Sequence, residues 1–148
     1  MENKKILLVE DNHNDIDLTK RALKKSNILN ELIVAEDGVE GLKYFFGEDG
    51  KGGCSVEDLP VVVLLDINLP RINGLDLLRR LRTHEKTKLI PMIILTSSNE
   101  EKDIITSYNL GANSFVRKPV KFDEFAEAVR VLGLFWLVIN QPAPKGKL

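Results

Sequence analysis

Five short runs of almost wholly apolar residues limit the folds that this chain can adopt. Each run has the length of a β-strand, and segments in which apolar residues recur every three or four positions separate one run from the next. Strands that are apolar on both faces are typical of parallel sheets with helices on both sides. The sequence therefore predicts an α/β domain with a doubly wound, five-stranded parallel sheet and right-handed crossovers. The runs are Ile6–Val9, Leu32–Ala35, Val61–Leu65, Met92–Leu95 and the more mixed Ser114–Val116.

The segments between the runs are predicted to be helices, and two of them carry end signals. Residues 98–101 (Ser-Asn-Glu-Glu) have the pattern of a capping box, which would start the fourth helix. The fifth helix is predicted from near Lys121 to about Asn140, because Pro142 cannot continue it. Residues 47–59 are rich in glycine and charge but contain no phosphate-loop pattern, so we expect a flexible surface insertion there.

Length and composition favour one domain of ordinary character. We expect a single domain over residues 1–148, with its core at about 5–140, a flexible tail at 141–148 and no output domain. Lysine plus arginine (21) nearly balances aspartate plus glutamate (22), so the basic excess of a nucleic-acid binder is missing. The longest apolar stretch, Val131–Ile139, is far shorter than the about 20 residues that span a membrane. The single cysteine, Cys54, fits a reducing compartment, and we expect a cytoplasmic protein that binds neither nucleic acid nor membranes.

Polar residues follow four of the apolar runs directly. Glu10 and Asp11 follow the first run, Asp66 the third, Thr96 the fourth, and Lys118 comes at the end of the fifth. Each residue alone could be a turn residue, a helix cap or surface charge. In a doubly wound sheet, however, the carboxyl ends of the strands meet at one edge, where such folds place their sites. The joint pattern therefore predicts a site.

The residue types at this edge point to phosphoryl chemistry. Three neighbouring carboxylates repel one another, and a hard divalent cation such as Mg²⁺ relieves that repulsion while leaving room for phosphoryl oxygens. A carboxylate can attack phosphorus and form an aspartyl phosphate. A lysine ammonium and a threonine hydroxyl can then donate hydrogen bonds to the phosphoryl oxygens.

The motifs that carry these residues resemble the receiver domains of two-component response regulators. The separations also agree with that family: thirty residues from Asp66 to Thr96 and twenty-two from Thr96 to Lys118. The resemblance extends from about Lys5 to Phe135 and implies a flavodoxin-like (βα)5 fold with strand order 2-1-3-4-5. The matching segments are LLVEDN, VVVLLDINLPRINGLDLL, MIILTSS and FVRKPV.

By this resemblance, Asp66 is the phosphoacceptor, and Glu10, Asp11 and Asp66 hold Mg²⁺ together with the backbone carbonyl of Asn68. The protein would accept phosphate from a sensor histidine kinase, catalyse its own phosphorylation and lose the phosphate slowly. It would not otherwise be an enzyme. Its output would be contact with a downstream protein target, or transfer of the phosphate to a phosphotransfer protein.

The resemblance also implies how the site signals. Thr96 and Lys118 would bind the phosphoryl oxygens, Lys118–Pro119 would be a cis peptide bond, and Thr96 and Phe115 would act as the switch pair. Phe115 lacks the hydroxyl of a tyrosine, so its rotation can change packing but cannot create a hydroxyl contact. The long loop and aromatic C-terminal end look most like stand-alone receivers of the cyanobacterial-phytochrome type, so a phytochrome-like kinase is one candidate partner.

Two other functions remain open from the residues alone. A small phosphohydrolase with an aspartyl-phosphate intermediate would need a general acid two residues after Asp66, and Asn68 cannot serve as one. A flavin-binding redox protein would place the flavin phosphate against the acidic residues, which disfavours it. Repeated turnover of small phosphate esters would indicate the phosphohydrolase.

The end of the last helix predicts a homodimer. An ordinary surface helix has one apolar stripe, but from Val131 to Ile139 no polar face remains. One side of this segment can pack on the sheet, and the other would expose Phe135 and Trp136 for pairing with a second copy. The alternatives are that the helix unwinds after Gly133 and the tail folds over its own core, or that the patch binds the kinase or the target.

Overall fold

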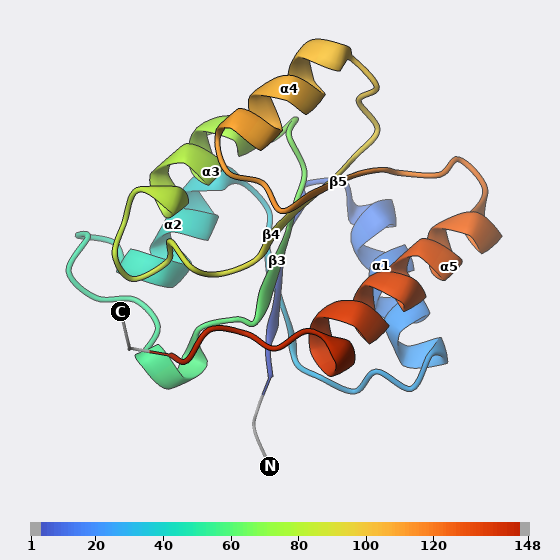
Figure 1. Cartoon of the computed structure of the whole chain (residues 1–148), viewed down its shortest axis with the longest axis horizontal. Coiled ribbons are helices and arrows are strands. Elements are labelled where there is room, and N and C mark those ends of the chain that lie inside the picture. Colours follow the sequence, from blue (N-terminus) through green and yellow to red (C-terminus); the bar gives the residue numbers. More distant parts are fainter. Residues whose placement is uncertain (1–3, 146–148) are drawn as a thin grey trace.

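Five parallel strands form one sheet in the order β2-β1-β3-β4-β5 in a computed structural model that describes residues 4–145 (Figure 1). This confirms the predicted doubly wound sheet and its strand order. The strand positions differ from the apolar runs by one residue at most, because Val61 lies outside β3 while Thr96 and Arg117 end β4 and β5. The strands are β1 (Ile6–Val9), β2 (Leu32–Ala35), β3 (Val62–Leu65), β4 (Met92–Thr96) and β5 (Ser114–Arg117).

The strands are apolar on both faces because each face of the sheet has its own core. In β1, Leu7 and Val9 belong to a core with residues of α2 and α3, whereas Ile6 and Leu8 belong to a core with residues of α1 and α5. Figure 1 shows the same division, with α2, α3 and α4 on one side of the sheet and α1 and α5 on the other. The helices are α1 (His13–Lys25), α2 (Gly38–Phe46), α3 (Gly74–Arg82), α4 (Glu101–Asn109) and α5 (Phe122–Gly133).

Side-chain caps start the first three helices, but the capping box predicted for α4 does not form. Asn12, Asp37 and Asn73 each accept a hydrogen bond from a backbone N–H in the first turn of α1, α2 and α3. α4 begins after Glu100 without a side-chain cap. The Ser98 hydroxyl donates to Asp103 Oδ2 at 2.6 Å and accepts from the Glu100 N–H at 3.4 Å, so it binds a side chain of α4 and the residue before the helix rather than an N–H of the first turn.

The segment at residues 47–59, expected to be a flexible insertion, is tied to the domain by hydrogen bonds. The Cys54 N–H donates to the Tyr44 carbonyl at 2.8 Å, and the Tyr44 hydroxyl donates to the Asp58 carbonyl at 2.8 Å. The Lys86 ammonium donates to the Cys54 carbonyl at 2.7 Å and also to the Phe45 carbonyl. A short 3₁₀ helix, Val56–Asp58, lies within the segment. A lysine 32 positions away from Cys54 in the chain therefore helps to hold this segment against the domain.

The C-terminal helix changes character after Gly133. A π-helical segment, Leu134–Ile139, follows α5, and its wider turn is closed by a hydrogen bond from the Asn140 N–H to the Phe135 carbonyl at 2.6 Å. Leu137 is buried, and Trp136 is half-buried against the core between the sheet, α1 and α5. Trp136 was predicted to be exposed, but it is partly buried against the core. The exposed residues, here called the C-terminal apolar face, are Val131, Leu134, Phe135, Val138 and Ile139.

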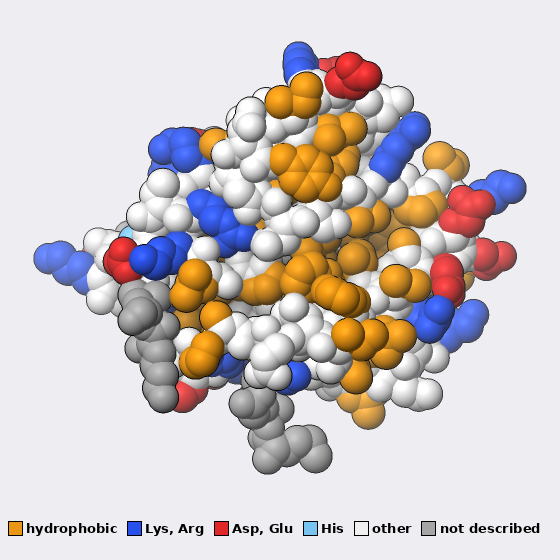
Figure 2. Space-filling model, viewed as in Figure 1, with side chains coloured by type: hydrophobic (Ala, Val, Ile, Leu, Met, Phe, Trp, Pro, Cys, Tyr) orange, Lys and Arg blue, Asp and Glu red, His pale blue; other side chains and the backbone are white. Residues whose placement is uncertain are grey.

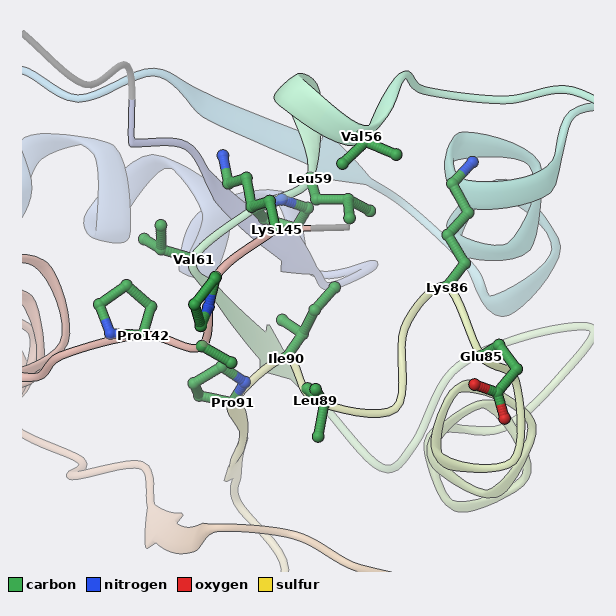
Figure 3. A pocket seen from close by; sticks show the side chains of 13 residues that line it. Val56, Leu59, Val61, Glu85, Lys86, Leu89, Ile90, Pro91, Pro142 and Lys145 are labelled. Carbon is green, nitrogen blue, oxygen red and sulfur yellow. The ribbon is translucent and has the colours of Figure 1, made fainter. Parts of the chain in front are cut away.

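The tail beyond this segment crosses the end of the sheet opposite the predicted site. Pro142 and Lys145 line a cavity of about 270 Å³ together with Leu59, Leu89 and other residues (Figure 3). The Lys145 ammonium donates to the Glu57 carbonyl at 3.1 Å. Residues 146–148 of the expected tail lie outside the described residues. Among residues 4–145, no helix combines the length and apolar character needed to span a membrane.

Candidate functional site

The carboxyl ends of four strands bring the predicted site residues together. Glu10 and Asp11 follow β1, Asp66 follows β3, Thr96 ends β4 and Lys118 follows β5. β1 and β3 are neighbours with Val9 opposite Leu65, so the carboxylates that follow these strands lie side by side. Parallel pairing with a common register places all five residues at one edge of the sheet.

Asp66 receives a hydrogen bond on each carboxylate oxygen. The Thr96 hydroxyl donates to Oδ1 at 2.7 Å, and the Asn68 N–H approaches the same oxygen at 3.3 Å. The Lys118 ammonium donates to Oδ2 at 2.9 Å. Asp66 and Thr96 are buried, so these interactions act in a medium of low dielectric constant, where charge-assisted hydrogen bonds are strong.

Lys118 contacts three carboxylates, and one of them, Asp15, was not predicted from the sequence. Its ammonium donates to Glu10 Oε1 at 2.5 Å, to Asp66 Oδ2 at 2.9 Å and to Asp15 Oδ2 at 2.8 Å. Asp15 lies in the first turn of α1, close to the same edge of the sheet. Its place there, four residues after Asp11 in the helix that leaves β1, is the signal that could have identified it.

Glu10, Asp11 and Asp66 fit a divalent cation. One carboxylate oxygen from each lies within 4.8 Å of the others. Mg²⁺ and similar hard cations prefer oxygen ligands and are held by one or two carboxylates with other oxygen donors. Glu10 and Asp66 are buried while Asp11 is exposed, so the group is open to solvent on one side.

The Lys118–Pro119 bond is trans, and the prediction of a cis bond is wrong. No peptide bond among residues 4–145 is cis. The trans form is the lower-energy form before proline by about 0.5–1 kcal/mol. The Lys118 N–H donates to the Thr96 carbonyl at 2.7 Å, and the side chain reaches Asp66 with the bond trans.

Burial and neighbouring charges shift two pKa values at the site. Burial raises the pKa of Glu10 to about 7; the hydrogen bond from Lys118 opposes this shift, and repulsion from Asp66 adds to it. Burial alone would lower the pKa of Lys118, but hydrogen bonds to Asp15, Glu10 and Asp66 outweigh it and hold that pKa above its ordinary value. The ammonium therefore stays charged across the physiological range.

The raised pKa of Glu10 predicts that the metal-free protein loses stability as the pH rises. Between about 4.5 and about 7, folded Glu10 holds a proton that the unfolded chain releases. The stability from this group is therefore complete below pH 4.5 and is lost as the pH rises through 7. Glu10→Gln should raise the free energy of unfolding at pH 8 by on the order of 1–3 kcal/mol and change it little at pH 5. Urea unfolding with a chelator at both pH values tests this, and an equal difference at both would contradict it.

The remaining predicted residues lie away from the acidic edge. Phe115 is in β5, opposite Ile94 of β4, and packs partly buried against the core that includes α2 and α3. Phe135 is 43% exposed on the C-terminal apolar face, and its ring lies 4.9 Å from that of Trp136 in a T-shaped arrangement. The 270 Å³ cavity is at the other end of the sheet, so the hollow in the surface and the charged site do not coincide.

Comparison with known proteins identifies the family. The model of the response regulator receiver domain matches residues 6–130, most of the chain. The chain belongs to the response regulator receiver family. The match covers every strand, the acidic residues, Thr96 and Lys118. As a receiver domain, the protein has a signalling role rather than that of an enzyme.

Relatives of this receiver domain include phytochrome response regulators. Response regulator Rcp1 from Synechocystis sp. is 34% identical over 141 residues, which cover 95% of this chain and 94% of Rcp1. The crystal structure of the phosphorylated cyanobacterial phytochrome response regulator RcpA superposes with a TM-score of 0.86 at 33% identity and covers 96% of this chain and 99% of RcpA. The Mn²⁺-bound form of Rcp1 superposes with a TM-score of 0.85 at 32% identity and covers 95% and 99% of the two chains. These comparisons support the two-component role and give no support to a phosphohydrolase.

Proposed function

We propose that this receiver domain accepts a phosphoryl group from a sensor histidine kinase on Asp66. One observation carries the assignment. Asp66 is a buried carboxylate that receives hydrogen bonds from Thr96 and Lys118. Both groups could donate to the oxygens of a phosphoryl group bound to Asp66. Glu10 also accepts from Lys118, but the Thr96 hydroxyl donates to Asp66, so Asp66 is the carboxylate that has both groups beside it.

The transfer follows from these contacts. A carboxylate oxygen of Asp66 attacks phosphorus and forms a new O–P bond, while the P–N bond to the kinase histidine breaks and its electron pair leaves with the imidazole. The Thr96 hydroxyl and the Lys118 ammonium donate hydrogen bonds to the phosphoryl oxygens. In hydrolysis, water attacks phosphorus and the Asp66 carboxylate leaves.

We propose Mg²⁺ as the cofactor, held by Glu10, Asp11 and Asp66 with the backbone carbonyl of Asn68. The oxygen donor set suits it, and the relative Rcp1 has been crystallised with Mn²⁺. When bound, the cation offsets the repulsion between these carboxylates and the phosphoryl oxygens. The test of the proposed function is intact mass after incubation with acetyl phosphate and Mg²⁺, which should add one phosphoryl group and should add none with a chelator.

Output would be contact with another protein on the α4 side of the sheet, near its β5 edge. Thr96 would move toward the phosphoryl oxygens and open space that Phe115 can enter, changing the packing beneath α4. Ile105 and Tyr108 of α4 are more than half exposed, and Figure 2 shows hydrophobic side chains over α4 and again near α5. The downstream partner would be a protein target or a phosphotransfer protein.

The kinase partner would be phytochrome-like, since Rcp1 and RcpA are similar to this chain over nearly its whole length and RcpA is described as a phytochrome response regulator. With its single cysteine, the protein would work in the cytoplasm. Phosphotransfer from candidate histidine kinases to the purified protein identifies the partner, which should be the kinase with the fastest transfer.

The protein is further proposed to be a homodimer that pairs through the C-terminal apolar face. This face holds five exposed apolar residues, and a two-fold pairing would cover the same residues on both copies. Phe135→Glu should raise the dimer dissociation constant by about 30-fold or more, as expected for a central aromatic residue. Sedimentation at micromolar concentration measures this change.

The matched control for the dimer is Leu29→Glu. Leu29 is 84% exposed but lies between α1 and β2, outside the C-terminal apolar face. This variant should dimerise like the wild type. A wild-type protein that sediments as a monomer, with or without phosphorylation, would contradict the dimer. The test is made at Phe135 and not at Trp136, because Trp136 packs against the core.

A further inference from the structure

The Lys118 ammonium has three N–H donors, and three different carboxylates take them. Two of these acceptors, Glu10 and Asp66, also belong to the group of carboxylates that fits a divalent cation. The third acceptor, Asp15, is not in that group. Asp15 is thus the one carboxylate around Lys118 with no second function in the site.

The backbone of α1 holds Asp15 in place. Its N–H donates to Asn12 Oδ1 at 3.2 Å, and its carbonyl accepts a hydrogen bond from the buried Thr19 hydroxyl at 2.7 Å. The Asp15 side chain is 24% exposed, whereas that of Lys118 is only 8% exposed. The carboxylate therefore comes from a fixed turn of helix and binds a buried ammonium.

We infer that Asp15 is a positioning residue, which holds the Lys118 ammonium beside Asp66 during phosphoryl transfer; this inference rests on the proposed phosphorylation of Asp66. A lysine ammonium sits on a flexible four-carbon chain and needs fixed partners to keep one position. Glu10 and Asp66 are shared with the cation site and the reaction. Asp15 is the partner of Lys118 that takes no part in the cation site or in the reaction.

Of the three hydrogen bonds that the Lys118 ammonium donates, only the bond to Asp66 changes its acceptor during the reaction. As Asp66 forms its bond to phosphorus and the donor's leaving group departs with the electron pair, the N–H that points to Asp66 Oδ2 turns to a phosphoryl oxygen. The N–H bound to Asp15 keeps its acceptor. The bond to Asp15 thereby keeps the ammonium nitrogen in place while another N–H changes its acceptor. No proton leaves Lys118.

The opposite effect of Asp15 is also conceivable on charge alone. A fourth carboxylate near the site would repel an anionic phosphodonor, and its removal would then speed phosphorylation. The geometry favours positioning, because Asp15 Oδ2 lies 2.8 Å from the ammonium and the charge of the pair is largely compensated. The two possibilities predict rate changes of opposite sign.

The experiment compares phosphorylation rates of intact variants with acetyl phosphate at saturating Mg²⁺. Asp15→Ala should lower the maximal rate about tenfold, the size expected when one hydrogen bond to a charged group is lost. Asp15→Asn, which keeps an acceptor oxygen, should recover most of the rate. The Mg²⁺ dissociation constant from calorimetry should stay close to that of the wild type, because Asp15 is outside the cation group.

Two further variants separate position from charge. Asp17 lies on the same helix, and its carboxylate pairs with Arg21 at 3.2 Å and does not contact Lys118. Asp17→Ala should therefore react like the wild type. Asp15→Glu keeps the charge but displaces the carboxylate by one methylene, so it should react more slowly than the wild type. If Asp15→Ala does not fold, Asp15→Asn and Asp15→Glu still decide the question.

A measurement without any phosphodonor tests the same contact. In protein with ¹⁵N-labelled lysine, the buried Lys118 ammonium should exchange its protons slowly and give an observable NMR signal. That signal should broaden or vanish in Asp15→Ala and persist in Asp17→Ala. A merely structural function of Asp15 would not alter this signal selectively.

The outcomes are distinct. Unchanged or faster phosphorylation of Asp15→Ala overturns the inference, as does a slower rate with an unchanged Lys118 signal. A wild-type protein that acetyl phosphate does not label refutes the proposed function itself. Normal labelling of the wild type with no effect of Asp15 refutes only the positioning function.

Discussion

Asp66→Asn should abolish labelling by acetyl phosphate and Mg²⁺. The amide that replaces the carboxylate has no anionic oxygen to attack phosphorus, although its shape still fits between Thr96 and Lys118. Intact mass should show the wild-type protein with one added phosphoryl group and the variant with none. Circular dichroism should show that the variant is folded.

The matched control is Asp76→Asn. Asp76 is a carboxylate on α3 that pairs with Arg80 at 3.1 Å, away from the acidic edge. Its substitution changes the same functional group and should leave labelling unchanged. If Asp66→Asn were labelled as much as the wild-type protein, Asp66 would not be the phosphorylation site. Asp11, the exposed carboxylate of the group, would then be the next residue to test.

Gly74→Val should destabilise the protein by about 3 kcal/mol or more, at the upper end of the cost of overpacking. A Cβ on Gly74 would lie 2.0 Å from the carbonyl oxygen of Asp66 and 2.8 Å from Cα of Ile67. Both are backbone atoms at the end of β3, so neither can rotate away as a side chain could. α3 would have to move off the strand that carries Asp66. Urea unfolding measures the loss of stability.

Gly52→Ala provides the control, because a Cβ at Gly52 would meet no atom within 4 Å. Its free energy of unfolding should stay within about 0.5 kcal/mol of the wild type. Gly74→Val should also lower the rate of phosphorylation, since the displaced backbone belongs to Asp66. An unfolding midpoint equal to the wild type would show that the N-terminus of α3 can shift freely.

The strands could be predicted because their signal is local. Each is apolar on both faces, and the structure shows the reason in β1, where alternate residues enter different cores. The polar residues after the strands were predicted to form a site for a similar reason. Parallel strands end at one edge, so position in the chain already implied position in space.

The errors came where side chains and backbone groups have partners that the local sequence pattern does not suggest. Ser98 was expected to cap α4, but its hydroxyl donates to the Asp103 side chain and binds no N–H of the first turn. The loop at residues 47–59 reads as flexible from its glycines, yet Lys86 binds the carbonyls of Phe45 and Cys54. Trp136 was expected on the surface, but the π-helical segment brings it against the core. The partners of the loop and of Trp136 lie far away in the chain, so a local window of sequence does not reveal them.

The sequence by itself determined the alternation of strands and helices, the edge at which the site forms and the residue types that make up its chemistry. These follow from hydrophobic period and from the residue at each strand end, both of which are properties of short segments. Only the tertiary structure decided that Asp15 joins the site, that Lys118–Pro119 is trans and that Phe135 rather than Trp136 faces outward. The Lys118 ammonium and the Asp15 carboxylate are 103 positions apart in the chain, and the hydrogen bond of 2.8 Å between them depends on how α1 packs against the sheet that contains β5.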